Sequence, residues 1–138
     1  MTKQRPKPGA VIRLALPDGR FAFGRVYRDA TVCWYGDAGF DPDSPPIGSR
    51  DFLFCTGVSD DAVKGWTVCG LDPFQPDEDD GWPPPTSVRD PITGRFKIYY
   101  RGAMREADEA EAATLEPAAV WDEHHLVGRL ADLLSESP

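Results

Sequence analysis

The sequence VIRLALPDGRFAFGRVYR occupies residues 11–28 and decides the fold. Apolar and polar side chains alternate on both sides of Pro17-Asp18-Gly19, which is typical of strands with one buried face. An Asp-Gly pair between two such runs favours a tight turn, because glycine accepts the positive φ that the turn needs. We therefore predict a β-hairpin here. Gly24 inside its second strand indicates a bulge or a close backbone approach.

Further strands are predicted along the chain from the same kind of pattern. Residues 31–35 are rich in β-branched and aromatic side chains and would complete a three-stranded meander. Four more short strands are predicted at residues 51–55, 65–71, 95–101 and 103–107. The segments 36–49 and 72–85 are rich in proline, glycine and aspartate, so they are predicted to be exposed loops.

The last third of the chain carries a helical pattern instead. Val120, Val127 and Leu134 are spaced seven residues apart, and Leu126 and Leu130 add to the same side. We predict one amphipathic helix over residues 116–134, with Trp121 widening its apolar stripe.

The predicted fold is mostly β (α+β). It is a curved antiparallel sheet or an SH3-like open barrel of five to seven strands, covered by the C-terminal helix. The 138 residues are expected to form a single domain, with residues 1–9 as a flexible N-terminal tail.

The formal charge of −8 is concentrated in the middle of the chain. Residues 36–90 contain 12 acidic and three basic side chains, whereas the remaining residues are close to neutral. Such a surface repels phosphate backbones and attracts basic proteins. We therefore predict a basic protein partner and no nucleic-acid partner. Ordinary solubilising charge is the alternative interpretation.

The sequence holds no GxGxxG, P-loop, HExxH or GxSxG motif. His124 and His125 are adjacent, so on a helix they would point about 100° apart, which disfavours a shared metal ion. The acids at residues 77–80 lack the EF-hand spacing. We therefore predict no enzymatic activity, no cofactor and no metal. A small hydrolase that pairs one histidine with a carboxylate remains an alternative.

The cysteines predict a reducing compartment. Cys33, Cys55 and Cys69 are odd in number and widely spaced, so we expect reduced thiols that pack as small apolar side chains. No apolar run approaches the roughly 20 residues of a membrane span. The basic, proline-rich start does not resemble a secretory signal. These features predict a cytoplasmic protein without a membrane partner.

Trp34, Trp66 and Trp121 are expected in the core, whereas Trp82 follows the run of acids. An aromatic residue beside acids is typical of a hot spot for a basic partner, although it could also pin the loop to the body. If Trp34, Tyr99 and Tyr100 lay exposed on a sheet face, a carbohydrate-binding module would be favoured instead. The predicted partner-binding residues are Asp37, Asp41, Asp43, Asp77, Glu78, Asp79, Asp80 and Trp82.

Three segments resemble a known family. They are LALPDGRFAFGRV at residues 14–26, PITGRFKIY at residues 91–99, and AVW at residues 119–121 followed by HLVGRL at residues 125–130. In this order they resemble the immunity protein 26 family of bacterial polymorphic toxin systems. The family often opens its first strand with Gly-Asp, and here Gly9 is followed by Ala10.

The resemblance implies a non-enzymatic immunity protein, which binds a cognate toxin domain and occludes its active site or another essential surface. Toxins of such systems are often nucleases with basic substrate sites, which acidic loops would match. Gly24, Arg25, Trp121 and Arg129 match motif positions of the family, and we expect them to have structural roles. We expect Arg129 to pair with an acid near the sheet, and direct toxin contact by Arg25 or Arg129 is the alternative.

Overall fold

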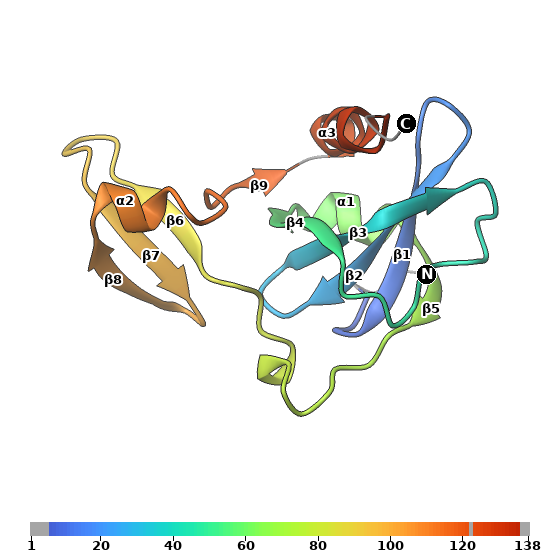
Figure 1. Ribbon diagram of the computed structural model, residues 1–138, viewed down its shortest axis with the longest axis horizontal. Coiled ribbons are helices and arrows are strands. Elements are labelled where there is room, and N and C mark those ends of the chain that lie inside the picture. Colours follow the sequence, from blue (N-terminus) through green and yellow to red (C-terminus); the bar gives the residue numbers. More distant parts are fainter. Residues whose placement is uncertain (1–5, 122, 136–138) are drawn as a thin grey trace.

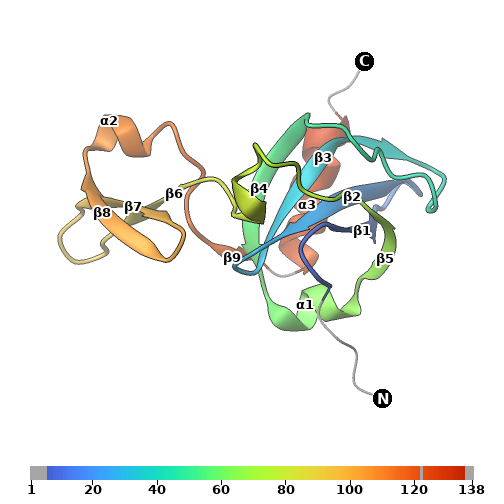
Figure 2. The same cartoon turned by 90° about the horizontal axis from the view of Figure 1, so that it is seen from below.

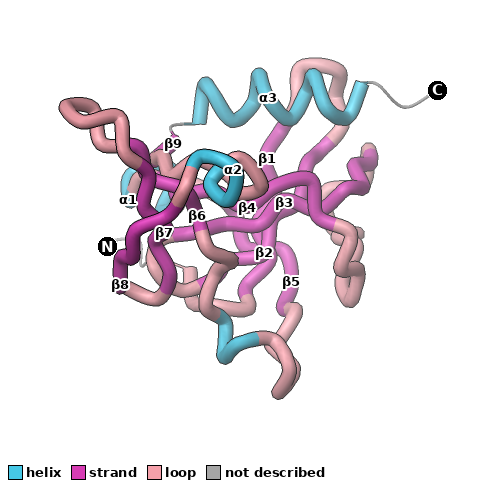
Figure 3. The backbone as a smooth tube through the Cα atoms, turned by 60° about the vertical axis from the view of Figure 1, so that its left-hand side comes forward, coloured by secondary structure: helices cyan, strands magenta, loops and turns pink. Residues whose placement is uncertain are grey.

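The computed structural model describes residues 6–121 and 123–135, most of which form strands and loops (Figures 1 and 3). The strands are β1 Ala10–Ala15, β2 Phe21–Tyr27, β3 Thr31–Gly39, β4 Phe52–Val58, β5 Thr67–Leu71, β6 Thr86–Arg89, β7 Phe96–Tyr100, β8 Ala103–Ala107 and β9 Val120–Trp121. The helices are α1 Asp60–Gly65, the 3-10 turn η1 Asp79–Gly81, α2 Glu109–Ala112 and α3 Glu123–Ser135. Within the described residues, no helix is long and apolar enough to cross a membrane.

The main sheet has the strand order β5-β1-β2-β3-β4-β9. Strands β1 to β5 pair antiparallel, and β9 adds to β4 as a short parallel strand. Over the described residues this sheet does not close into a barrel, so the mostly β prediction is confirmed in its curved-sheet form.

The predicted hairpin forms the centre of this sheet. Val11 pairs with Arg25 and Ala15 with Phe21, and Gly19 has the positive φ of 91° that the turn requires. The register between β2 and β3 shifts between Ala22 and Gly24, which is the expected bulge. A Cβ atom on Gly24 would lie 2.5 Å from Val32 Cγ1, so the close approach is present too.

Alternation along the strands creates two buried faces. On one face Ile12, Val26 and Trp34 pack with Leu126 and Leu130 of α3. Figures 1 and 2 show α3 lying across this side of the sheet. On the other face a smaller cluster contains Val11, Phe23 and Tyr35. Arg25 belongs to this second face, because it alternates with Gly24 and Val26 on β2.

The C-terminal helix begins later than predicted. It starts at Glu123 instead of residue 116, although its buried leucines lie at the expected spacing of four. Val120 and Trp121 pair with Gly57 and Val58 of β4, so they extend the sheet and are not part of the helix. The prediction failed because apolar spacing at Val120 fits a strand as well as a helix.

Residues 86–112 lie beside the main sheet, and their strands β6, β7 and β8 make a three-stranded antiparallel sheet (Figures 1 and 2). The predicted strands at 95–101 and 103–107 are therefore confirmed as strands but belong to this small sheet. Residues 116–121, which we call the strap, join the two sheets. Ser87 N donates to Glu116 O at 3.0 Å, Ala118 N donates to Ser87 O at 2.7 Å, and the strap ends in β9.

The expectation of three reduced thiols is wrong. Cys33 and Cys55 lie directly opposite each other on β3 and β4 and form a disulfide, with their Cα atoms 3.9 Å apart. Cys69 is free and half-buried. The pairing could not be inferred from spacing along the chain, because only the register of two strands creates it. The cysteines therefore no longer support the prediction of a reducing, cytoplasmic compartment.

Candidate functional site

The acidic loop, residues 72–82, crosses the face of the main sheet that α3 leaves open (Figures 1 and 2). Apart from η1 it has no regular structure, and a buried arginine holds its first half. Arg25 donates from Nε to Asp72 O and from Nη2 to Pro73 O, both at 2.8 Å. Its Nη1 forms an ion pair with Glu78 at 2.8 Å. One side chain of β2 thus fixes the backbone and a carboxylate of the loop.

The surroundings of Arg25 explain how a charge is tolerated inside the protein. Its side chain is fully buried, and its guanidinium carbon lies 4.0 Å from the ring centroid of Phe74. The hydrogen bonds from Arg25 lower the pKa of Glu78 to about 2, and burial opposes this only in part. Glu78 is therefore ionised at neutral pH and serves as the internal counter-ion of Arg25.

A second arginine joins the acidic loop to the loop before β4. Arg50 forms ion pairs with Asp72 and Glu78, both at 2.9 Å. Asp72 also accepts a 2.5 Å hydrogen bond from the Tyr35 hydroxyl. Burial raises the pKa of Asp72, but the hydrogen bonds from Arg50 and Tyr35 outweigh burial, so its pKa is lowered overall. The prediction that this loop is exposed throughout is wrong at Asp72, which is 3% exposed.

The second half of the acidic loop is held from two other places. Arg28 donates to Asp80 O at 2.6 Å, and its backbone N donates to Gly81 O at 2.8 Å. Arg101, in the turn between β7 and β8, forms an ion pair with Asp79. Asp79 and Asp80 have positive φ values of 56° and 54°, a conformation that aspartate tolerates better than most residues. The carboxylates of Asp79 and Asp80 are therefore each paired with an arginine from another element, and both remain partly exposed to solvent.

The predicted partner-binding residues fall into three places. Arg50 brings the acidic loop next to the loop that carries Asp41 and Asp43, where Asp43 forms an ion pair of 2.9 Å with Arg13. Asp37 lies apart, in a recess beside Leu133 and Leu134 near the end of α3. Asp77 is exposed in the acidic loop. The structure therefore links the two loops that carry most of the predicted residues through Arg50, and Asp37 lies apart from both.

Trp82 ends the acidic loop and is half-buried. The guanidinium carbon of Arg28 lies 5.7 Å from its ring centroid, and Trp82 N donates to Asp79 O at 3.1 Å. These contacts are those of a residue that pins the loop, while part of the ring remains accessible to a partner.

Three arginines that pair with acids of residues 36–90 were not predicted from the sequence, because they lie outside that segment. Arg13, Arg28 and Arg101 lie outside residues 36–90, yet they pair with Asp43, Asp80 and Asp79. The negative charge of the segment is therefore partly neutralised in three dimensions. The sequence did offer a signal at Arg25. Alternation along β2 places Arg25 on a buried face, and a buried arginine needs an acidic partner beside it.

The other motif positions of the resemblance also have structural contacts. Arg129 on α3 forms an ion pair with Glu116 of the strap. Its guanidinium carbon lies 3.7 Å from the ring centroid of Phe54 and 5.3 Å from that of Trp121. The pairing of Arg129 with an acid near the sheet thus has the expected form, and it fixes α3 against β4 and β9.

The described residues give little support to the hydrolase, metal-binding and carbohydrate-binding alternatives. His124 and His125 are exposed on α3, and neither lines the two pockets described for this structure. Within residues 6–121 and 123–135, no three His, Cys, Asp or Glu side chains are grouped to hold a metal ion. Trp34 is fully buried, which removes it from the aromatic set proposed for carbohydrate binding.

The comparisons leave the family open. The chain matches no protein-family model, no curated protein and no solved structure.

Proposed function

We propose that this protein is a non-enzymatic inhibitor, of the immunity type, that binds a basic toxin domain through its acidic loop. The observation that carries the proposal is the way in which Arg25, Arg28 and Arg101 hold an irregular, acid-rich loop in one conformation. Loops that carry function are held in this way by a rigid scaffold. The resemblance to immunity proteins in the first and last thirds of the chain supports the same class.

Preorganisation gives the loop an energetic advantage in binding. A flexible loop loses conformational entropy when a partner orders it, whereas this loop is already fixed by its arginines. Asp77, Asp79 and Asp80 would then present carboxylates to lysine or arginine side chains of the toxin. Glu78 would not take part, because it is the internal counter-ion of Arg25.

The ion pairs that the loop acids already form within the protein do not prevent binding of a basic partner. Arg28 and Asp80 have side chains that are 43% and 84% exposed, and exposed ion pairs contribute little to stability. Such pairs can exchange for a basic side chain of the partner at small cost. A nuclease as the target, and action in the cytoplasm, are further parts of the proposal that rest on the resemblance and on charge.

The test is a pull-down from lysate of the producing cells, with this protein as bait at low and moderate salt. We expect recovery of a basic protein whose yield falls as salt rises, because exposed charge pairs are screened. The purified pair then allows association rates to be measured.

The decisive variant carries Asp77→Asn, Asp79→Asn and Asp80→Asn. We expect its association to slow by about tenfold, with a weaker salt dependence and a smaller change in dissociation. The matched control removes the same number of exposed charges elsewhere, as Asp61→Asn, Glu106→Gln and Glu109→Gln, and it should associate nearly as fast as the wild type. Equal rates for the two triple variants would reject the acidic loop as the binding surface.

A further inference from the structure

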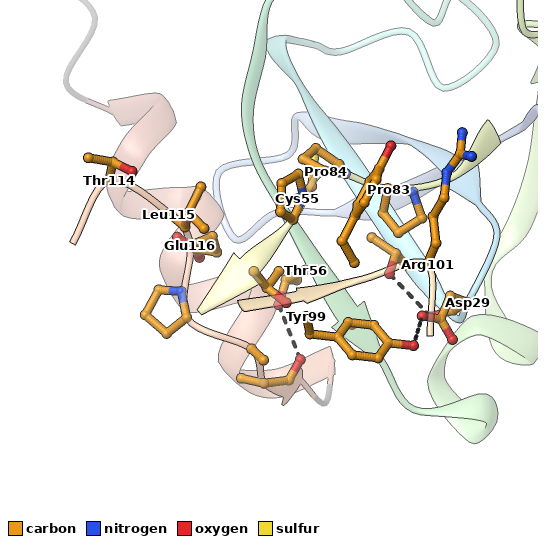
Figure 4. A pocket seen from close by; sticks show the side chains of 18 residues that line it. Asp29, Cys55, Thr56, Pro83, Pro84, Tyr99, Arg101, Thr114, Leu115 and Glu116 are labelled. Atoms are coloured by element: carbon orange, nitrogen blue, oxygen red, sulfur yellow. Dashed lines mark hydrogen bonds between the residues drawn. The ribbon is translucent and has the colours of Figure 1, made fainter. Parts of the chain in front are cut away.

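A pocket of about 470 Å³ lies between the main sheet and the small sheet (Figure 4). Its floor is the edge of β4 at residues 55–57, and its walls are residues 83–86, the end of β7 and residues 114–119. The strap closes one end, because Thr56 Oγ1 donates to Ala119 O and β9 pairs with β4. The volume falls within the range of roughly 300–1,000 Å³ that is usual for pockets of small ligands. None of the predicted partner-binding residues lines it, so the pocket is a separate site.

Most of the lining of this pocket is apolar or aromatic. Pro83, Pro84 and Pro85 form one wall, and Tyr99 and Tyr100 stand at the end of β7. Both tyrosines are half-buried, so each keeps some accessible surface. Such walls favour a ligand with an aliphatic or aromatic body, because the removal of apolar surface from water stabilises a complex.

The charged residues of the lining are Asp29, Arg101 and Glu116. Arg101 forms an ion pair with the acidic loop, and Glu116 forms one with Arg129. Asp29 differs from both, because its carboxylate is partnered, within the described residues, only by the neutral Tyr99 hydroxyl, which donates to it at 2.5 Å (Figure 4). This hydrogen bond raises the pKa of Tyr99, which keeps the hydroxyl protonated. The lining therefore carries one negative charge that no basic side chain of the described residues compensates.

The backbone holds Asp29 at a defined position beside the pocket. Asp29 and Ala30 form the turn between β2 and β3, with positive φ values of 63° and 54°. Thr31 Oγ1 donates to Asp29 O at 3.2 Å, and the Tyr99 hydroxyl orients the carboxylate. A carboxylate that is already oriented loses little conformational entropy when a ligand binds to it.

We propose that this pocket binds a small organic cation, whose ammonium group donates to the carboxylate of Asp29 and whose apolar body lies against the proline and tyrosine walls. An anion would meet a like charge, and a neutral ligand would cover Asp29 without supplying a counter-charge. A lysine side chain of a partner protein offers the same charge, but it is too slender to fill a pocket of this size. The inference goes beyond the binding of a toxin by the acidic loop and does not depend on it.

The test uses the full chain labelled with ¹⁵N and a panel of small molecules in matched sets. Each set carries one apolar body as an amine, an alcohol and a carboxylic acid, for example phenethylamine, phenethyl alcohol and phenylpropanoic acid. We expect the amines to shift the amide signals of Gly57 and Ala119 and to bind at least about fivefold more tightly than the alcohols, and the acids to bind more weakly still. Added salt should weaken binding of the amines and leave that of the alcohols unchanged, because only a charge pair is screened.

Asp29→Asn removes the charge and little else. Asparagine tolerates the positive φ of this turn and can still accept the hydrogen bond from Tyr99, so the fold should be kept. We expect this variant to bind each amine no more tightly than the matching alcohol. Asp77→Asn is the control, because it removes an exposed acid that does not line the pocket, and it should keep the preference for amines.

The proposal is overturned if no amine of the panel shifts the two amide signals, if amines and alcohols bind the wild type equally, or if the preference for amines survives Asp29→Asn. Loss of the preference in Asp77→Asn as well would show general attraction to an acidic chain and would also overturn it. N-acetyl-lysine amide represents a protein side chain, and the small-ligand assignment fails if it binds as tightly as the best amine. The comparison of amine with alcohol uses the wild-type chain, so it stands even if a variant does not fold.

Discussion

Arg25 and Glu78 form an ion pair of 2.8 Å although 53 residues separate them in the chain. The arginine side chain is fully buried and the glutamate side chain is 17% exposed, so little water screens the pair. The pair joins the centre of the main sheet to the acidic loop. Its loss would affect both the stability of the fold and the shape of the loop.

Arg25→Met should destabilise the protein by about 3–5 kcal/mol, because it removes the buried donor of two backbone carbonyls and the buried ion-pair partner of Glu78, which keeps its pair with Arg50. Urea unfolding followed by tryptophan fluorescence measures the change. Arg28→Met is the matched control, since its side chain is 43% exposed, and it should cost less than about 1 kcal/mol. Equal losses for the two variants would contradict the role assigned to Arg25.

The pair with Arg25 also predicts how stability depends on pH. The pKa of Glu78 is lowered from 4.5 to about 2 in the folded protein. The stability that its ionised form contributes is therefore present above about pH 4.5 and is lost as pH falls towards about 2. Glu78→Gln lacks this contribution, so its free energy of unfolding should fall less than that of the wild type over this interval.

Unfolding midpoints of wild type and Glu78→Gln near neutral pH and near pH 3 test this difference. Asp77→Asn is the control, because Asp77 is exposed in the same loop and should follow the wild type at both pH values. Parallel pH dependences for the wild type and Glu78→Gln would show that the carboxylate of Glu78 is not specifically stabilised.

The disulfide predicts a distinct labelling pattern. Unfolded without reductant, the chain should take up one alkylating group, at Cys69, and with reductant it should take up three. Mass spectrometry distinguishes the two states. Replacement of Cys33 and Cys55 by alanine should lower the free energy of unfolding by about 3 kcal/mol and make it insensitive to reductant. Three labels in the absence of reductant would disprove the bond.

Two glycines provide a matched pair of substitutions. A Cβ atom at Gly24 would lie 2.5 Å from Val32 Cγ1, so Gly24→Ala should cost about 1–3 kcal/mol through overpacking. Gly128 lies on α3 with open space around it, so Gly128→Ala should stabilise the helix by up to about 1 kcal/mol. Differential scanning calorimetry should therefore show opposite shifts in Tm, and a raised Tm for Gly24→Ala would contradict the close packing.

The parts of the fold that sequence predicts well are those set by local pattern. The alternation around Asp18-Gly19 fixes the hairpin, and the turn requires its glycine. Trp121 shows where this fails, because its apolar character suits a helix while pairing with Val58 makes it a strand residue. Sequence periodicity contains no information on which distant strand edge is vacant.

The acidic side of the candidate site could be predicted from the sequence, whereas its arginine partners could not. The acids of the loop are visible in the sequence as a run, but their partners Arg25, Arg28 and Arg101 come from other elements. The same is true of Cys33 and Cys55, which meet only through the register of β3 and β4. Long-range partners depend on topology, and a single sequence gives little access to it.

The strap has a consequence for the order of folding. Strands β1 to β3 are joined by short connections, so they can assemble early from neighbouring contacts, whereas the longer segment 40–51 separates β3 from β4. The pairing of β9 with β4 must close a loop that contains β5, the acidic loop and the whole small sheet, which makes it entropically late. Helix α3 follows β9 directly, so we expect it to dock last. The apolar face of the main sheet that packs against α3 therefore stays exposed until late in folding.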